Sequence, residues 1–293
     1  MKTMKLSIVA FLLLVCNLSV MAQHEEPVLV SVSYQFVHIY DTNNRASPIR
    51  KEMVLHIGQT NSKYNNGDVE NAWKKMKKEM AMAPARPTIT AIGKPMAVVP
   101  NAGNDILFQI PKEKKLISTA SLGIAEYIIE STLPAIDWKI ETETRKIDKY
   151  TCQKAVGSFA GRTYTAWFTA ELPFENGPWK LAGLPGLILE ATDSKNEVLF
   201  LFKEITQGEP DERIFSDQRR PIKVDEETFA RGRNAFSQDP SGTMQSQLKG
   251  YTEPIPAYYR DPSGKLLSGD EAKEAIKNEK KIYNNPIELT KNK

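Results

Sequence analysis

The chain has 293 residues, of which 39 are Lys or Arg and 36 are Asp or Glu, so its formal net charge is +3. A balance this close to neutrality gives no electrostatic basis for binding nucleic acid. Its two cysteines, Cys16 and Cys152, exclude a fold stabilised by several disulfides. A chain of this length can instead bury one large apolar core or two modest ones.

The N-terminal segment has the pattern of a secretory signal peptide. Lys2 and Lys5 precede an apolar stretch at 6–20, and cleavage is expected after Ala22. The apolar stretch is too short for a retained membrane anchor. Cleavage removes two lysines and no acid, so the net charge falls to +1 and Cys152 remains as the only thiol. The sequence therefore predicts an exported protein, periplasmic or envelope-associated, with no transmembrane span in the mature chain.

Two strands and a helix are predicted next along the chain. Apolar and aromatic side chains at every second position over 28–41 indicate a long strand, and 53–58 is its expected partner. Asp68 is predicted to cap a helix that packs on the sheet through Trp73. The apolar stripe of this helix consists of Val69, Trp73, Met76 and Met80. The prolines and glycines of 81–104 favour an extended connection.

Strand-length apolar runs dominate the middle of the chain. Most of the later runs are joined by connections short enough for hairpins, so neighbours in sequence should pair as antiparallel strands. We therefore predict an α+β fold that is mainly β, a strongly curved antiparallel sheet (a meander) with a few helices packed on it. The runs lie at 105–110, 115–118, 125–129, 138–147, 150–159, 163–172, 187–192 and 197–205.

The run at 197–205 is apolar on both faces, so both must be covered. Helices or loops of the same chain would suffice, since contiguous exposed apolar patches are uncommon on soluble monomers. The alternative is an apolar ligand or partner. On simple alternation, one face carries Leu199, Leu201 and Ile205, and the other carries Val198, Phe200 and Phe202.

The chain becomes polar after residue 210. Helices are expected at 226–236 and 270–283, and the repeated sequence Asp-Pro-Ser-Gly at 239–242 and 261–264 predicts two turns. The expected organisation is a signal peptide at 1–22, a β-rich core domain at 23–210, and a polar, helical or looped C-terminal region at 211–293 that is packed on the core or partly mobile.

The most informative stretch is WKLAGLPGLI at 179–188. Gly183 and Gly186 bracket Leu184-Pro185, which predicts a constrained turn feeding an apolar strand. The stretch holds no nucleophile, histidine, acid or metal-ligand spacing, so an architectural role is favoured. Tryptophans near a Gly-Pro turn can also line a ligand site. The candidate binding residues are Trp167, Gly177, Pro178, Trp179, Gly183, Leu184, Pro185, Gly186, Leu187 and Ile188.

The block from Trp138-Lys-Ile140 through Tyr150-Thr-Cys152, Gly161-Arg162, Ala166-Trp167-Phe168 and Gly183-Leu-Pro-Gly-Leu-Ile188 resembles the GLPGLI family of exported Bacteroidetes proteins. The tail sequence Asn285-Pro-Ile-Glu288 resembles the end of that family. Because the activity of the family is not established, the resemblance implies origin and export, and it supplies no catalytic residues. More loosely, the meander resembles the periplasmic lipoprotein-carrier folds, whose curved sheet holds apolar groups.

Residues able to do chemistry are sparse in this sequence. His38 is expected to be a satisfied core residue, and His56 would approach it only if the first two strands pair suitably. Two ligands alone do not make a metal site. Cys152 is predicted to be an inert packing residue. No G-x-S-x-G, H-E-x-x-H or phosphate-binding loop motif occurs, so we expect no catalytic residue, metal or cofactor.

These observations favour a non-catalytic binding or assembly protein of the cell envelope. It would hold an apolar or lipid-like group, or a partner segment, in a groove of the sheet, with Trp167 or Trp179 near the mouth. The expected partners are an apolar ligand, a lipid or an envelope protein, and not a nucleic acid. The alternative is an envelope hydrolase that uses carboxylates within 171–193, of which Glu171, Glu175, Glu190 and Asp193 are the acids to inspect.

Overall fold

The computed structural model of the chain describes residues 26–82, 106–123, 125–215, 221–248, 258–260, 265–278 and 283–290. Twelve strands form one sheet: β1 (Val30–His38), β2 (Ile49–Ile57), β3 (Ser62–Asn66), β4 (Leu107–Ile110), β5 (Lys115–Leu122), β6 (Ala125–Thr132), β7 (Trp138–Ile147), β8 (Tyr150–Phe159), β9 (Arg162–Thr169), β10 (Leu187–Asp193), β11 (Val198–Gln207) and β12 (Ile222–Val224). A separate pair consists of β13 (Tyr258–Arg260) and β14 (Leu266–Ser268). The helices are α2 (Gly67–Met82), the 3₁₀ turn η3 (Pro111–Glu113), α3 (Glu226–Gln238), α4 (Pro240–Gln247) and α5 (Gly269–Lys277).

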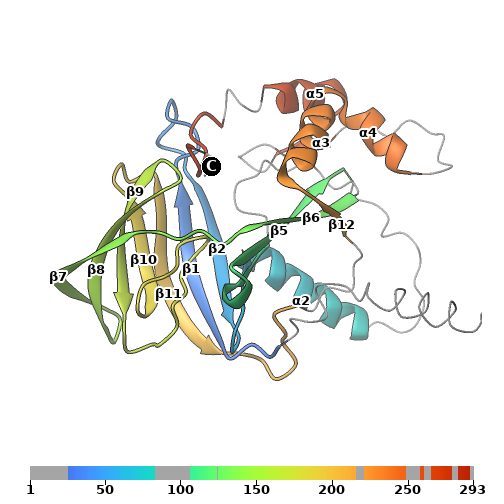
Figure 1. Ribbon diagram of the computed structural model, residues 1–293. Helices are drawn as coiled ribbons and strands as arrows, with labels where there is room; N and C mark the ends of the chain where they lie inside the picture. Colours follow the sequence, from blue (N-terminus) through green and yellow to red (C-terminus); the bar gives the residue numbers. More distant parts are fainter. Residues whose placement is uncertain are drawn as a thin grey trace, which may run out of the picture.

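The sheet has the strand order β12-β6-β5-β4-β3-β2-β1-β11-β10-β9-β8-β7. Every neighbouring pair is antiparallel except β12 and β6, which run parallel. Figure 1 shows that the sheet curls strongly, with β7 to β11 at one side and β5, β6 and β12 reaching toward α3, α4 and α5. The predicted fold class, mainly β with a curved antiparallel sheet and a few helices, is confirmed.

The meander predicted from hairpin-length connections is present as β7 to β11, in sequence order. Its strand ends match the predicted runs closely, although β9 stops at Thr169 and not at residue 172. The N-terminal strand β1 then pairs with β11, where Phe36 lies opposite Phe200. This long-range pairing joins the first strands to the meander, so one sheet carries both halves of the chain.

The main core lies on the inner face of the curved sheet. Alternate side chains of β1, such as Val32, Tyr34 and Phe36, share this core with Cys152 of β8 and Leu116 of β5. Strands so far apart in the order of the sheet can share one cluster only because the sheet curls. The loop that follows β9 fills the interior and completes this cluster.

The structure places Ile205 of β11 on the other face of the sheet from the one predicted. The register between β1 and β11 shifts between Ser33 and Tyr34, so that Phe202 pairs with Tyr34 and Glu204 pairs with Ser33. An extra residue in one strand moves every following side chain to the other face. Ile205 therefore lies opposite Val32 on the inner face, together with Val198, Phe200 and Phe202, and not with Leu199 and Leu201.

The helix α2 forms as predicted but faces the other way. It begins at Gly67, and the side chain of Asn66 accepts the hydrogen bond of the Val69 amide, so Asn66 and not Asp68 provides the cap. Trp73 is 55% exposed and does not pack on the sheet. Glu70 faces β2 instead, because it binds a buried histidine there. Val69, Trp73 and Met76 of the predicted stripe are exposed and do not face the sheet.

The C-terminal helices form a second apolar contact with the sheet. Phe229 and Phe236 of α3, with Met244 of α4, pack on Leu122 and Ile129. The expected turn at 239–242 is wrong: Asp239 caps α4, and its carboxylate accepts the hydrogen bond of the Gly242 amide. Asp followed by Pro suits the first positions of a helix as well as those of a turn.

Some predictions lie outside the described residues. These are the signal peptide, the second turn at 261–264, the last turn of the helix expected at 270–283, and the connection at 81–104 beyond the two residues that end α2. Among the helices that the structure describes, none has both the length and the apolar character needed to cross a membrane.

Candidate functional site: an aromatic cavity behind the glycine-rich loop

The loop between β9 and β10 enters the inner core. Three of its apolar side chains, Trp179, Leu181 and Leu184, are buried, as are Leu187 and Ile188 at the start of β10. Trp179 itself has a left-handed backbone with φ of 57°. The Trp138 indole nitrogen donates to the Ala182 carbonyl oxygen, and the Tyr34 hydroxyl donates to the Ile188 carbonyl oxygen. The motif thus closes the curved sheet from inside, which is an architectural role.

The two motif glycines are required for different reasons. Gly186 has φ of +147°, and a Cβ atom built on it would lie 2.2 Å from the Thr169 carbonyl oxygen. No side chain fits there without moving the backbone. Gly183 has φ of +92° but no atom within 4 Å of the same position. Gly183 therefore serves backbone conformation alone, whereas Gly186 also allows the loop to approach the end of β9.

A cavity of about 120 Å³ lies between the inner face of the sheet and this loop. It receives side chains from six strands, from the loop and from the C-terminal tail. Most of the lining is apolar or aromatic, as in small-molecule sites generally. The lining residues are Phe36, Met53, Tyr64, Leu107, Ser118, Trp179, Lys180, Phe200, Ile287 and Glu288.

Aromatic rings form one wall of the cavity. The rings of Phe36 and Phe200 stack with centroids 5.2 Å apart, and Trp179 stacks on Phe200 at 6.3 Å. Tyr64 completes the aromatic lining and is 3% exposed. Within the described part of the chain, its hydroxyl has no hydrogen-bond partner. Burial, with the nearby Tyr34, raises the pKa of Tyr64 well above its usual value, so the hydroxyl stays a neutral donor.

The opening of the cavity is polar. Lys180 and Glu288 form an ion pair, and their side chains are 21% and 31% exposed. The Lys180 ammonium also lies 5.6 Å from the Trp179 ring centroid. Since the aromatic and aliphatic lining residues from the strands are nearly fully buried, this ion pair marks the side that reaches water.

The tail residues at the opening are held by a buried arginine. The Arg162 guanidinium donates to the carbonyl oxygens of Pro286 and Ile287 and to the side chain of Asn285. It also pairs with Asp193 at 2.8 Å and with Glu197 at 3.2 Å. We call this set the Arg162 clasp. It fixes residues 285–288 over the inner face, so that Ile287 and Glu288 become cavity walls.

The binding residues predicted from the sequence differ in where they lie relative to the cavity. Trp179 lines the cavity, while most of the other motif residues are buried beside it or, like Gly183 and Pro185, lie exposed at the turn. Trp167 lies on the other face of β9, where the Arg145 guanidinium stacks over its ring at 4.2 Å, and it is not among the lining residues.

The two described histidines do not meet. In the β1–β2 ladder His38 pairs with Ile49 and His56 pairs with Ser31, which places them at opposite ends. The His38 Nε2–H donates to the Asn285 carbonyl oxygen at 2.8 Å. Burial, helped by the charge of Arg162, outweighs the raising effect of the Asn285 carbonyl and nearby acids and lowers the pKa of His38 to about 4. His38 is thus a core histidine of the clasp.

Two of the acids proposed for hydrolysis are paired with arginines. Glu190 pairs with Arg145, and Asp193 is buried against Arg162. Cys152 is fully buried, and burial raises the pKa of its thiol to about 11, which agrees with a packing residue.

Sequence reasoning missed Tyr64 and the clasp. The strand that carries Tyr64 reads SKYNN and lacks an apolar alternation, so nothing in it signalled a buried strand. Arg162 lies 123 residues from Asn285, and only the resemblance of the tail sequence pointed to that segment.

Comparisons with known proteins add a family match and structural likeness. A model of the family described as "Protein of unknown function (Porph_ging)" matches residues 159–190, which include β9 and the glycine-rich loop. No curated protein matches the chain. Two structures of PNGF-II, in different space groups, are similar at a TM-score of 0.49. Their sequences are 17% and 16% identical to this one, and each match covers 70% of this chain. The chain spans about a third of the length of these solved chains, since the matches cover 33% and 32% of them. At residues 159–190 the sequence thus matches a family whose function is unknown.

Proposed function

We propose that this protein is a non-catalytic binding or assembly protein that holds the apolar end of a ligand, or of a partner segment, in the cavity behind the glycine-rich loop. The observation that carries the proposal is the Tyr64 hydroxyl, which is buried at an apolar cavity and has no partner among the described residues. An unsatisfied buried hydroxyl costs about 1–3 kcal/mol. A ligand that supplies an acceptor to this hydroxyl removes that cost.

The volume of the cavity limits the size of the bound group. Apolar cavities of about 150 Å³ accommodate benzene, whereas sites for whole drug-sized ligands occupy roughly 300–1,000 Å³. A cavity of about 120 Å³ accepts one small ring or a short alkyl segment. The rest of a larger ligand would extend past Lys180 and Glu288 into water. A lipid or peptide would therefore be held by one end only.

The proposed location is the periplasm or the envelope. The support is the signal-peptide pattern before Gln23, together with the sequence resemblance to an exported Bacteroidetes family. N-terminal sequencing of protein recovered from a periplasmic fraction tests this, because a mature chain starting at Gln23 is expected. A chain that retains Met1 in the cytoplasmic fraction would contradict it.

The alternative of an envelope hydrolase has less support from the geometry. A hydrolase of the glycosidase type uses two carboxyl groups that flank one substrate bond. Glu190 and Asp193 instead face Arg145 and Arg162, and Glu171 accepts a hydrogen bond from the Thr151 amide. We therefore develop the binding proposal.

Benzene, phenol and pentanoate are suitable probes of the cavity. For ligands of six or seven heavy atoms, dissociation constants on the order of 0.1–1 mM are expected. Phenol should bind more tightly than benzene, because its oxygen can accept a hydrogen bond from Tyr64. Titration followed by ligand-observed NMR, with the shift in Trp179 emission as a second signal, measures this. Trp73→Phe, at a half-exposed position, removes a background fluorophore.

Two variants make the test specific. Leu107→Phe enlarges a lining side chain and should abolish binding of all three probes. Tyr64→Phe should keep benzene binding and remove the preference for phenol, with little loss of folding stability because no hydrogen bond is broken. Ile117→Phe, also a buried enlargement but outside the lining set, is the control that retains binding. Failure of every probe to bind the wild type would contradict the proposal.

A further inference from the structure

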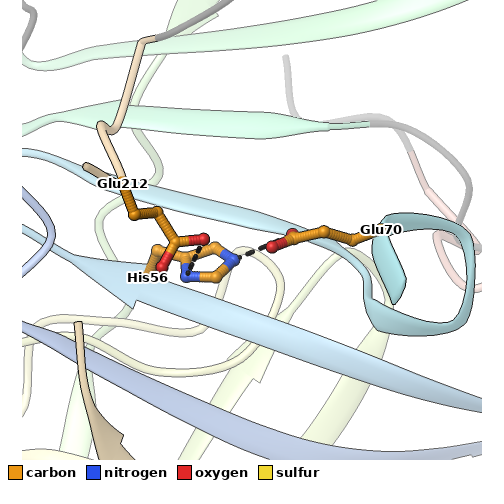
Figure 2. Close-up of side chains that lie close together, drawn as sticks. All are labelled: His56, Glu70 and Glu212. Carbon is orange, nitrogen blue, oxygen red and sulfur yellow. Dashed lines mark hydrogen bonds and ion pairs between the residues drawn. The ribbon is translucent and has the colours of Figure 1, made fainter. Parts of the chain in front are cut away.

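A second group of side chains with metal-ligand chemistry lies on the other face of the sheet. His56 of β2, Glu70 of α2 and Glu212 of the segment after β11 each offer one ligand atom, and these atoms lie within 4.8 Å of one another. Figure 2 shows the imidazole ring between the two carboxylates. His56 alternates with the core residues Leu55 and Ile57, so this group is separate from the cavity.

The ring of His56 is held in one orientation. Its Nε2 lies 3.0 Å from a Glu70 carboxylate oxygen, and its Nδ1 lies 2.8 Å from the Ser31 hydroxyl and 3.7 Å from Glu212. The His56 side chain is only 3% exposed. Histidine ligands of metals are oriented in this way, by a hydrogen bond at the nitrogen that does not bind the metal.

The carboxylates are prepared as ligands. The side chains of Glu70 and Glu212 are 15% and 13% exposed, so their positions are restricted.

An amide at the edge of the group is incompletely paired. The Asn65 Nδ2 donates to the same Glu70 carboxylate at 2.6 Å, while its Oδ1 is buried and has no hydrogen-bond partner among the described residues. Asn65 is 6% exposed. A buried, unpartnered oxygen on a side chain that contacts Glu70 is an additional acceptor for a cation or for a water bound to one.

A lysine now supplies the positive charge between the carboxylates. The Lys74 ammonium lies 2.9 Å from Glu70 and 3.3 Å from Glu212. Its side chain is 54% exposed, unlike the three candidate ligands. Lys74 can therefore rotate into water at small cost, because an exposed ion pair contributes little.

We propose that His56, Glu70 and Glu212 form a binding site for a divalent transition-metal ion of the Zn²⁺ class, which takes the place of the Lys74 ammonium. One imidazole nitrogen with two carboxylates is a donor set that suits Zn²⁺ and its neighbours, and three protein ligands leave a coordination position open. Calcium is disfavoured because it takes oxygen ligands.

Binding requires a small rearrangement. A single ion bonds one ring nitrogen, and Zn²⁺ bonds are about 2.0–2.2 Å long, so the ligand atoms must approach one another more closely than now. Because Nε2 already faces Glu70, it is the nitrogen we assign to the metal. Glu212 then moves from the Nδ1 side toward Nε2, while the Ser31 hydroxyl keeps the ring in place.

Isothermal titration of the metal-free protein with Zn²⁺ tests the proposal. The wild type should bind one equivalent. Glu212→Gln keeps the size of the side chain and should weaken binding at least tenfold, since even indirect partners of metal ligands matter by about 10–100-fold. Lys74→Met should strengthen binding severalfold by removing the competing cation. Glu190→Gln, at an ion-paired carboxylate elsewhere in the sheet, is the matched control and should bind like the wild type.

Two results would overturn the assignment. One is the absence of one-equivalent binding to the wild type. The other is equal affinity in the wild type and Glu212→Gln. Circular dichroism of each metal-free variant shows whether it is folded, so a loss of binding is not mistaken for a loss of structure.

Discussion

Two charge networks, one on each face of the sheet, join segments that are distant in sequence. In the Arg162 clasp the cation is 1% exposed, and its partners Asp193 and Glu197 are 2% and 6% exposed. In the His56 group the cation Lys74 is 54% exposed. Exposure of the cation therefore distinguishes a fixed network from one that we propose is exchangeable. A buried guanidinium cannot leave its partners, whereas a half-exposed ammonium can.

Removal of the Arg162 charge tests the fixed network and should have the largest effect. Arg162→Met leaves Asp193 and Glu197 buried without their cation, which typically costs about 3–5 kcal/mol of unfolding free energy. Arg145→Met, at a 42% exposed arginine paired with Glu190, should cost less than about 1 kcal/mol. Urea unfolding monitored by circular dichroism measures both. A cost for Arg162→Met as small as that of the control would show that the Arg162 clasp is not a fixed network.

The inner face also depends on close approach of the backbone at the glycine-rich loop. The two motif glycines distinguish the effect of this close approach from the effect of a positive φ. Gly186→Ala combines an unfavourable φ with overlap against the Thr169 carbonyl oxygen, so we expect a loss of about 3 kcal/mol or more. Gly183→Ala has open space and should cost only about 1 kcal/mol through its φ. Thermal unfolding of the pair checks this. Equal losses would show that the close approach at Gly186 is unimportant.

The clasp should respond to pH through His38. The folded state holds the pKa of His38 near 4, below its ordinary value of 6.5, so the unfolded chain binds the proton more readily. Stability is therefore full above pH 6.5 and decreases as pH falls toward 4, by up to about 3 kcal/mol. Measurement of the unfolding free energy of the wild type and of His38→Gln between pH 4 and pH 6.5 isolates the contribution of His38. If the two curves of unfolding free energy against pH are parallel, His38 is not the group responsible.

The exchangeable network should contribute least to stability. In the absence of metal, Lys74→Met is expected to change the unfolding free energy by less than about 1 kcal/mol, because half-exposed ion pairs are screened by water. Lys63, 4.0 Å from Glu70, retains part of the positive charge. Urea unfolding at low and high salt measures the difference. A loss comparable to that of Arg162→Met would mean that Lys74 is a fixed part of the fold.

Local patterns predicted the meander well, and contacts between distant residues explain the failures. Strands β7 to β9 and the pair β10–β11 follow from apolar runs and short connections. The bulge that turns Ile205 inward depends on the pairing with β1 and leaves no trace in the alternation of β11. Trp73 was misplaced because the pattern of α2 does not reveal that buried His56 binds its polar side.

The candidate sites were predictable only in part. Trp179 was identified from the motif, whereas Tyr64 was hidden in a polar strand. The His56 group draws on residues 56, 70 and 212, so it has no spacing that a sequence motif could display. Charge offered no signal for Glu70 either, because the lysines near it make the local sequence look like a solvated helix face.

The position of the tail makes closure of the inner face depend on the C-terminal residues. The Asn285 backbone amide donates to the Tyr40 carbonyl oxygen, and its side chain donates to the Ile39 carbonyl oxygen, at least 245 positions away in sequence. Without residues 285–288, Arg162 would keep its two carboxylate partners and lose the oxygen acceptors of the tail. A chain shortened before Asn285 would therefore lack one wall of the cavity.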